Sequence, residues 1–380
     1  MRICIIQRIF STYRKPIFDS IATNFELTVI HGKNERGINQ TTAPYSEEVG
    51  VIKYGLQESQ VYIKAVRSIL RKRPDIVIHE FSPSILTLHI VFILSKILKF
   101  KFVLWGHGYN HIKGFHPQNS LAAALRLFYL KRADAVILYG NEAKSVLSSY
   151  INPEKIFVAP NTLDTSSLKK IKEGLDKCGK AAIRNEIGMK NKYNMLYIGR
   201  MLKTKHPELL IEVYEKIKDK LNNNIGVHFI GDGEQVLSIH RMVEEKHYEN
   251  NIFLHGPIHD DFLNGEYLYA SDIMVMPGYV GLSVNHAFCF GCPVITFEQG
   301  YNGPFHSPEI EYLIHNNTGF QISNFDVDEM TKTIFDYLTN TGMQEEIKKN
   351  IEYTINNICS IEMMLKGFTD CFSWIARKNK

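Results

Sequence analysis

The sequence predicts a protein of two α/β domains, each built on a parallel β-sheet. The chain has 380 residues, which exceeds one ordinary hydrophobic core and suffices for two domains. Short apolar runs alternate with longer amphipathic runs in both halves of the chain. This alternation is typical of parallel sheets covered by helices on both faces. A polar, lysine-rich stretch separates the two halves.

The first half contains six apolar runs with the length of buried strands and four runs with helical spacing. We expect strands at residues 3–6, 27–30, 76–78, 102–105, 135–138 and 156–158, and helices at 61–71, 84–99, 120–131 and 142–149. The second half repeats the pattern, with strands expected at 195–198, 227–230, 252–254, 273–276 and 294–297.

The expected boundaries follow from these runs. We place an N-terminal Rossmann-like domain at residues 1–165, a linker at 166–193 and a C-terminal Rossmann-like domain at 194–359. A last amphipathic run occupies residues 360–380. Ligands of such open sheets bind outside the carboxyl ends of the strands, so two domains that face each other would hold a ligand across a cleft.

Charge is distributed unevenly along the chain. Residues 1–170 contain 23 Lys and Arg against 12 Asp and Glu, a balance of +11, while the remainder has 21 against 28, a balance of −7. A basic half indicates an anionic partner, either a nucleic acid or a membrane surface, although drift in surface composition would also produce it. The apolar run at residues 85–98 has 14 residues and is too short to span a bilayer, so a buried or interfacial helix is expected.

The expected compartment is the cytoplasm. The six cysteines are sparse for this length, which favours a reducing environment. The first residues read as a strand and show neither the long apolar run nor the small-residue cleavage site of a signal peptide.

Basic residues and glycines follow the strands expected in the second half. Arg200 and Lys205 flank a loop that opens a helix, where backbone N–H groups already favour an anion. Ordinary solvated cations before a helix would explain the two residues as well. Gly231 follows the next strand, and backbone N–H groups around Gly281 to Val284 are expected to be free. Together these loops predict a diphosphate site.

Motifs in this order make the chain resemble the retaining, nucleotide-sugar-dependent glycosyltransferases of family four, which have the GT-B fold. In the second half they are Gly199-Arg200 with Lys205, Gly231-Asp232-Gly233, Ser271-Asp272-Ile273 before Met276-Pro277, and Ala287 to Pro293. In the first half they are Gly106-His107-Gly108, Lys131-Arg132-Ala133-Asp134, and Pro160 to Asp164. The resemblance covers roughly residues 2–375.

The resemblance implies roles for these residues. Arg200 and Lys205 would bind the donor diphosphate and His107 would lie near the transferred sugar, and these three form the expected catalytic set. The final helix would cross back to the N-terminal domain, and no metal or other cofactor would be needed. Apart from the resemblance, Tyr13 and Arg14 follow the first strand and are expected to bind acceptor phosphate, although a solvated helix that begins there would also explain them. The residues expected to bind donor are Gly199, Gly231, Pro257, Ile258, Gly281, Leu282, Ser283, Val284 and His286.

One departure from the family pattern concerns its two glutamates, which are separated by seven residues. The loop between Pro277 and Gly281 is shorter by three residues and lacks the first glutamate, while His286 stands at the position of the second. In the family the first glutamate touches the donor sugar and the second touches the ribose. Donor identity therefore cannot be carried over from the family pattern.

The expected function is hexosyl transfer from a UDP- or GDP-sugar to a glycan or lipid-linked acceptor, in surface polysaccharide or glycolipid synthesis. An anionic membrane surface on the inner face of the cell membrane is a further expected partner, and nucleic acid is not. Two alternatives stay open: a GT-B sugar-nucleotide epimerase, and a catalytically silent nucleotide-sugar-binding subunit. Asp326-Val-Asp328 resembles a metal motif of another glycosyltransferase fold, but helix capping is expected there.

Overall fold

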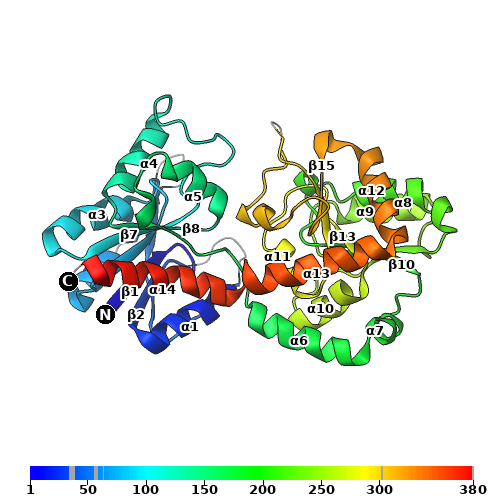
Figure 1. Cartoon of the computed structure of the whole chain (residues 1–380), viewed down its shortest axis with the longest axis horizontal. Coiled ribbons are helices and arrows are strands. Elements are labelled where there is room, and N and C mark those ends of the chain that lie inside the picture. The colour runs from blue at the N-terminus through cyan, green and yellow to red at the C-terminus, as the bar shows by residue number, and fades with distance from the viewer. Residues whose placement is uncertain (34–38, 55–58, 63, 301–302, 379–380) are drawn as a thin grey trace. The chain divides into compact units, whose positions relative to one another are not determined.

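The computed structural model describes residues 1–33, 39–54, 59–62, 64–300 and 303–378, and it divides into two compact units (Figure 1). Unit 1 comprises Met1–Asp164 together with Ile361–Lys380, and unit 2 comprises Thr165–Ser360. Each unit has its own parallel sheet, as the alternating runs predicted.

The sheet of unit 1 has seven strands in the order β3-β2-β1-β6-β7-β8-β9, and all neighbouring strands are parallel. The strand order reverses between β1 and β6, which marks the ligand-binding edge of such a sheet. The strands are β1 (Arg2–Gln7), β2 (Glu26–His31), β3 (Ser46–Glu48), β6 (Ile76–Glu80), β7 (Lys101–Gly106), β8 (Ala135–Leu138) and β9 (Ile156–Val158). β4 (Val51–Tyr54) and β5 (Ser59–Tyr62) form a separate two-stranded antiparallel sheet.

Helices cover both faces of this sheet. They are α1 (Lys15–Asn24), α2 (Ala65–Lys72), α3 (Leu86–Leu98), α4 (Leu121–Arg132), α5 (Asn141–Ser148) and α14 (Ile361–Lys378), with 3-10 turns η1 (Thr12–Arg14) and η2 (Pro153–Lys155). The helix expected at 61–71 begins only at Ala65, because Val61 and Tyr62 pair with Ile52 and Val51 in the hairpin.

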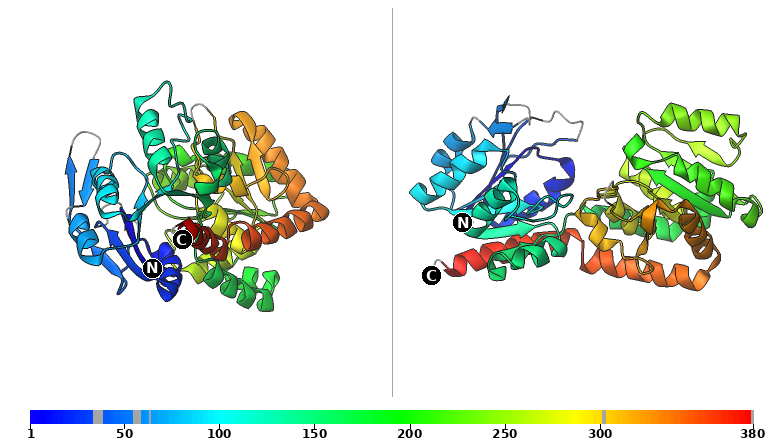
Figure 2. Two further views of the ribbon diagram at one scale, coloured as in Figure 1. Left: turned by 60° about the vertical axis from the view of Figure 1, so that its left-hand side comes forward. Right: turned by 90° about the horizontal axis from the view of Figure 1, so that it is seen from above.

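Helix α14 belongs to unit 1 although it comes from the far end of the chain. The right-hand view in Figure 2 shows it along unit 1. The Phe368 ring packs edge-on against Trp105 of β7 at 4.8 Å between centroids, and Phe372 packs against Phe25 at 5.3 Å. Gly367 permits this approach, because a Cβ there would lie 2.2 Å from the carbonyl oxygen of Val158.

Unit 2 has a sheet of six parallel strands in the order β12-β11-β10-β13-β14-β15. Its strand order reverses between β10 and β13. The strands are β10 (Tyr193–Ile198), β11 (Ile225–Ile230), β12 (Ile252–Leu254), β13 (Ile273–Val275), β14 (Val294–Phe297) and β15 (Gly319–Ile322). Its helices and turns are α6 (Thr165–Cys178), α7 (Lys180–Glu186), η3 (Lys203–Lys205), α8 (Leu209–Ile217), η4 (Asp219–Leu221), α9 (Val236–Glu245), α10 (Asp261–Ala270), α11 (Ser283–Cys289), η5 (Pro308–Tyr312), η6 (Ser323–Phe325), α12 (Val327–Thr339) and α13 (Thr341–Asn357).

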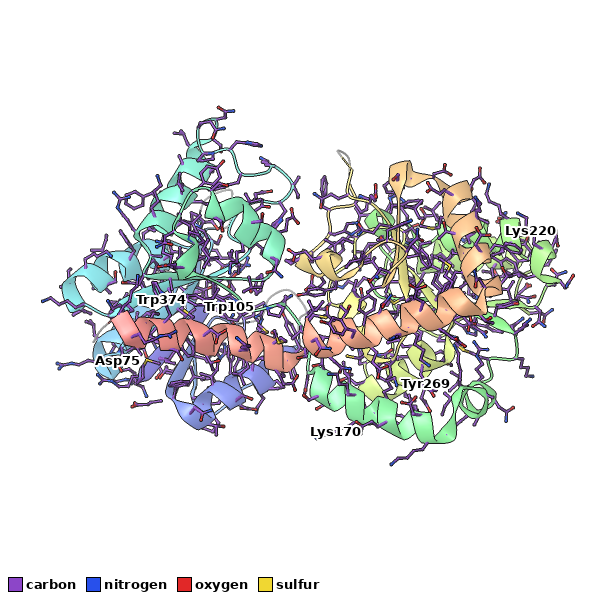
Figure 3. The ribbon with its side chains drawn as sticks, in the orientation of Figure 1. Asp75, Trp105, Lys170, Lys220, Tyr269 and Trp374 are labelled. Atoms are coloured by element: carbon purple, nitrogen blue, oxygen red, sulfur yellow. The ribbon has the colours of Figure 1, made fainter. Side chains whose placement is uncertain are left out.

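The stretch at 166–193, expected as a linker, instead forms α6 and α7 and packs on unit 2. Burial, and after it the neighbouring Asp176 of α6, raises the pKa of Tyr269 of α10 to about 12, and Tyr269 is labelled in Figure 3. Arg184 of α7 donates to the Asp272 carboxylate at 2.7 Å, and Lys180 donates to its other oxygen at 2.9 Å. The polar composition of this stretch gave no clear helical pattern in the sequence, because only a few apolar side chains of the two helices are buried: Leu168, Leu175 and Ile183.

Candidate active site

Three loops of unit 2 meet at the carboxyl ends of its central strands. Glycines permit the contact. A Cβ on Gly231, whose φ is +142°, would lie 2.0 Å from the carbonyl oxygen of Gly199. A Cβ on Gly278 would lie 2.4 Å from Cα of Lys205, and the Gly278 N–H donates to the Lys205 carbonyl at 3.1 Å. The loops after β10, β11 and β13 are thereby locked side by side at the reversal of strand order.

Arg200 and Lys205 lie close together in this group of loops. Arg200 is exposed, and Lys205 is partly buried with its Nζ 4.9 Å from the centroid of the Tyr279 ring. Burial, and after it the charge of Arg200, lowers the pKa of Lys205. Within the described residues, no carboxylate forms an ion pair with either cation. Two adjacent cations of this kind have the chemistry to bind an anionic ligand such as a phosphate.

His306 holds the loop that joins β13 to α11. Its Nδ1 accepts from the Val280 N–H at 3.2 Å, and its Nε2–H donates to the Phe297 carbonyl at 2.8 Å. The Ser307 N–H donates in turn to the Val280 carbonyl at 3.0 Å. Burial lowers the pKa of His306, which favours the neutral tautomer that this geometry requires. Sequence reasoning missed His306, because its partners lie 9 and 26 positions away and no local pattern indicates them.

The loop itself presents backbone donors. In the described part of the chain, the N–H groups of Gly281, Leu282 and Ser283 have no hydrogen-bond partner. The Val284 N–H was expected to be free, but it donates to the Gly281 carbonyl at 2.9 Å because the helical turn has already begun. The Tyr279 hydroxyl lies 3.5 Å from Ser307 Oγ, so two hydroxyls that the sequence analysis did not single out flank these donors.

His286 lies one turn into α11. It is half-buried, and its Nε2 is shielded from solvent without a hydrogen-bond partner among the described residues. Burial lowers the pKa of the imidazole to about 4, so the ring is neutral at pH 7. An unpaired buried nitrogen has the capacity to hydrogen bond a ligand hydroxyl.

Pro257 and Ile258 follow β12 at the border of the same loops. The Gly256 carbonyl accepts from the Gly231 N–H at 2.9 Å, and Asn264 Nδ2 donates to the Ile258 carbonyl at 3.1 Å. The segment is therefore fixed beside the loop after β11, with Pro257 exposed.

In unit 1, Arg14 lies beneath the carboxyl ends of the strands rather than in solvent. Its guanidinium stacks over the Trp105 ring at 4.5 Å. It donates to the Tyr139 hydroxyl at 3.0 Å and to Asn161 Oδ1 at 3.1 Å, which ties the ends of β8 and β9 together. Only its Nη1 is buried without a partner within the described residues. Tyr13, expected beside it as an acceptor residue, lies with its ring 5.4 Å from the same guanidinium.

His107 follows β7 and is exposed as a residue. Its ring packs edge-on against Tyr139 at 5.1 Å and against His111 at 5.8 Å. Partial desolvation of the ring, and after it the neighbouring His111, lowers the pKa of His107. The imidazole is therefore neutral at pH 7 and can exchange a proton or a hydrogen bond with a ligand.

The Asp326-Val-Asp328 run and two cysteines near α11 have structural roles. Asp326 caps α12 by accepting from the Glu329 N–H at 2.9 Å, as predicted. Cys289 and Cys292 are buried at the turn between α11 and β14, and burial raises the pKa of the Cys292 thiol to about 12.

Residues 179–353 match the family described as "Glycosyl transferases group 1". The two-domain architecture with parallel sheets is the GT-B fold. Structures of this class include Anabaena HepE in complex with UDP, which superimposes with a TM-score of 0.70 at 15% identity over 98% of this chain and 100% of HepE.

Two curated relatives come from Staphylococcus aureus. A poly(ribitol-phosphate) alpha-N-acetylglucosaminyltransferase is 28% identical over 182 residues, 47% of this chain and 34% of that protein. The capsular polysaccharide biosynthesis glycosyltransferase CapH is 27% identical over 192 residues, 48% of each chain. This chain therefore spans half or less of the length of these two relatives.

Proposed function

We propose that this protein is a retaining glycosyltransferase that moves a hexosyl group from a UDP- or GDP-sugar to a glycan or lipid-linked acceptor. The proposal places it in the synthesis of a surface polysaccharide or glycolipid. The observation that carries it is the Arg200–Lys205 pair at the reversal of strand order in unit 2, for which the described residues provide no carboxylate partner. The phosphate groups of a nucleoside diphosphate would balance the positive charge of Arg200 and Lys205.

The relatives support both the donor and the acceptor in this proposal. The S. aureus enzyme is named for transfer of N-acetylglucosamine to poly(ribitol phosphate), and CapH is named for capsular polysaccharide synthesis. HepE has been solved with UDP and with UDP-glucose. A uridine diphosphate sugar is accordingly the first donor to test.

Charge development in the reaction suits the residues of unit 2. The bond from the anomeric carbon to the diphosphate oxygen breaks, and the anomeric carbon forms a bond to the acceptor oxygen on the same face. The acceptor proton passes to the departing phosphate oxygen. Negative charge grows on the leaving group, so Arg200 and Lys205 stabilise the transition state more than the bound donor. These cations would act in place of a metal ion, and turnover should be unchanged by EDTA.

Unit 1 would supply the acceptor side. His107 would contact the transferred sugar as a neutral imidazole. Tyr13 and the unpaired Nη1 of Arg14 would contact the acceptor from the loop after β1. Because Arg14 Nη2 donates to both Tyr139 and Asn161, we assign Arg14 the second role of positioning Tyr139 against His107.

Thermal shift with UDP, GDP and a panel of their sugars tests the donor site of the full chain. Turnover with and without poly(ribitol phosphate), and with a polyprenyl-phosphate-linked monosaccharide, then separates the possible activities. We expect a UDP-sugar to raise the melting temperature and nucleotide release to depend on acceptor. No shift with any nucleotide or nucleotide sugar would contradict the donor site.

A silent nucleotide-sugar-binding subunit is the second candidate, because the short loop after β13 lacks the first family glutamate and half-buried His286 stands at the position of the second. It would show the thermal shift without turnover. Release of nucleotide or an isomerised sugar without acceptor would indicate an epimerase instead.

A further inference from the structure

Helix α3 exposes a stripe of large apolar side chains. Its buried side consists of Thr87, Leu88, Val91 and Ser95, which pack on the sheet of unit 1. The opposite side carries Leu86, Ile90, Ile93 and Ile97, spaced by four, three and four residues as one helix face requires. Ile93 is 58% exposed and Ile97 is 67% exposed, so the unit buries neither.

Helix α4 carries a second stripe with the same spacing. Leu121, Leu125 and Phe128 are exposed, with Leu121 at 92%, and Arg132 continues the row. The two helices touch each other: Phe92 of α3 packs against Phe128 at 5.8 Å between ring centroids. We name the combined surface the α3/α4 face, and its members are Leu86, Ile90, Ile93, Ile97, Leu121, Leu125 and Phe128.

Cations border this face, and acidic residues are missing from its sequence. From Phe81 to Ala133 the chain has seven Lys and Arg and no Asp or Glu. The Arg132 guanidinium lies 3.9 Å from the centroid of the Phe128 ring, and Lys96 Nζ lies 5.1 Å from that of Phe92. These long side chains cover the apolar edge with their stems and present charge at its border.

Further basic groups gather at the carboxyl end of α4. Lys155 Nζ donates to the carbonyls of Leu130, Lys131 and Ala133 at 2.8 to 3.0 Å. A pocket beside it is lined by Lys101 and Lys378 as well as Asp134, and Lys378 Nζ lies 4.1 Å from the centroid of the Trp374 ring, labelled in Figure 3. Positive charge therefore concentrates at one end of the apolar stripes.

We propose that the α3/α4 face is the docking surface of this protein for an anionic phospholipid bilayer. The apolar stripes would enter the boundary between the lipid headgroups and the acyl chains. Lys96, Arg132 and their neighbours would then contact the lipid phosphates. Helix α3 has 13 residues, and no helix in the described residues is long and apolar enough to cross a membrane, so the helices would lie in the plane of the interface.

Charge distinguishes this occupant from a second copy of the chain. A two-fold contact would place the face against itself and bring Lys96 and Arg132 of one copy towards those of the other, with no acidic residue between Phe81 and Ala133 to offset their charge. An anionic bilayer offers hydrocarbon and phosphate together. The inference does not depend on the proposed transferase activity, because it concerns another surface of unit 1.

Co-sedimentation of the full chain with vesicles tests the proposal. We expect at least tenfold tighter binding to vesicles of 70% phosphatidylcholine and 30% phosphatidylserine than to phosphatidylcholine alone, and weaker binding at 0.5 M than at 0.05 M NaCl. The double variant Ile93→Gln, Ile97→Gln should bind phosphatidylserine-containing vesicles at least tenfold more weakly. The double variant Lys96→Glu, Arg132→Glu should show no preference for vesicles that contain phosphatidylserine.

Leu237→Gln in unit 2 is the matched control, because Leu237 is 72% exposed but lies outside the face. It should bind vesicles like the wild type. The proposal would be overturned if the wild-type protein bound neither kind of vesicle, or if the variants of the α3/α4 face bound vesicles as tightly as the wild type. A dimer in light scattering that the Ile93, Ile97 variant converts to monomer would also overturn it in favour of a second copy. The thermal shift with UDP should persist in every face variant, which separates this test from that of the donor site.

Discussion

The two units share one sheet plan but distribute charge in opposite ways. Unit 1 contains 25 Lys and Arg against 14 Asp and Glu, a balance of +11, and unit 2 contains 19 against 26, a balance of −7. Yet the cations that we assign to the donor, Arg200 and Lys205, belong to the acidic unit. The net charge of a unit describes its surface, whereas a binding site depends on where a few unpaired charges are held.

Exposed apolar residues differ between the units in the same way. In unit 1 they gather on α3 and α4, and in unit 2 they are spread over separate elements, with Leu237 on α9, Phe262 on α10 and Tyr353 on α13. Scattered apolar residues are normal on a protein surface, while gathered ones mark a contact. Unit 1 therefore has one continuous exposed apolar surface on α3 and α4, and the exposed apolar residues of unit 2 form no such surface.

The largest expected effect concerns the buried aromatic side chains in the core of each unit. Phe368→Ala in α14 should destabilise unit 1 by about 3–5 kcal/mol, because it empties a buried site against Trp105. Phe320→Ala in β15 should destabilise unit 2 by a similar amount. Calorimetry should show each variant lowering a different transition. If Phe368→Ala lowered the transition of unit 2 alone, α14 would not be part of unit 1.

The site in unit 2 is tested next. Arg200→Ala should lower kcat by roughly 100-fold or more, the scale for a lost electrostatic stabiliser of a leaving group. Lys205→Ala should act in the same direction. Lys218→Ala is the matched control, since Lys218 Nζ also lies over a tyrosine ring, Tyr248, at 5.0 Å but at the C-terminal end of α8 rather than in the loops of the site. Wild-type kcat for Arg200→Ala at saturating donor would refute its role.

His306→Phe should weaken donor binding by about tenfold, because it removes two hydrogen bonds worth about 0.5–1.5 kcal/mol each from the loop before α11. Donor Kd by calorimetric titration measures the effect. His306 is a positioning residue, so kcat at saturating donor should change less than Kd. His315→Phe, in the same unit, serves as the control. A fall in melting temperature with unchanged Kd would show that His306 stabilises the fold only.

Acid should weaken unit 2 more than unit 1 between pH 6.5 and 5. Burial lowers the pKa of four histidines in unit 2, namely His228, His255, His286 and His306, and desolvation lowers that of two in unit 1, His79 and His107. As the pH falls below 6.5, these groups gain protons in the unfolded chain before the folded one, so stability is lost. One unit of pKa corresponds to about 1.4 kcal/mol. Equal slopes for the two calorimetric transitions would contradict this count.

The smallest expected effect is at His286. His286→Ala should weaken donor binding by roughly threefold to tenfold, the value of one hydrogen bond of about 0.5–1.5 kcal/mol. kcat should be largely unchanged, because the ribose does not alter during the reaction. A variant with lower stability and unchanged donor Kd would identify His286 as a core histidine.

The sequence by itself determined the elements whose signal is local. Strands such as β1 and β10 are short buried apolar runs, and the glycines and cations that follow β10 and β13 can be read in the order of the chain. These features depend on periodicity and turn chemistry over a few residues, which a single sequence displays. The resemblance to GT-B glycosyltransferases rested on the same local motifs.

Only the tertiary structure decided the contacts between distant residues. Arg14 reaches Tyr139 across 125 positions, His306 reaches Val280 across 26, and α14 returns to Trp105 from the far end of the chain. The stretch at 166–193 became α6 and α7 because unit 2 offers a surface for their few apolar residues. The apolar stripes of α3 and α4 adjoin because the two helices pack through Phe92 and Phe128. Such pairings follow from packing over the whole unit, and no window of sequence contains both partners.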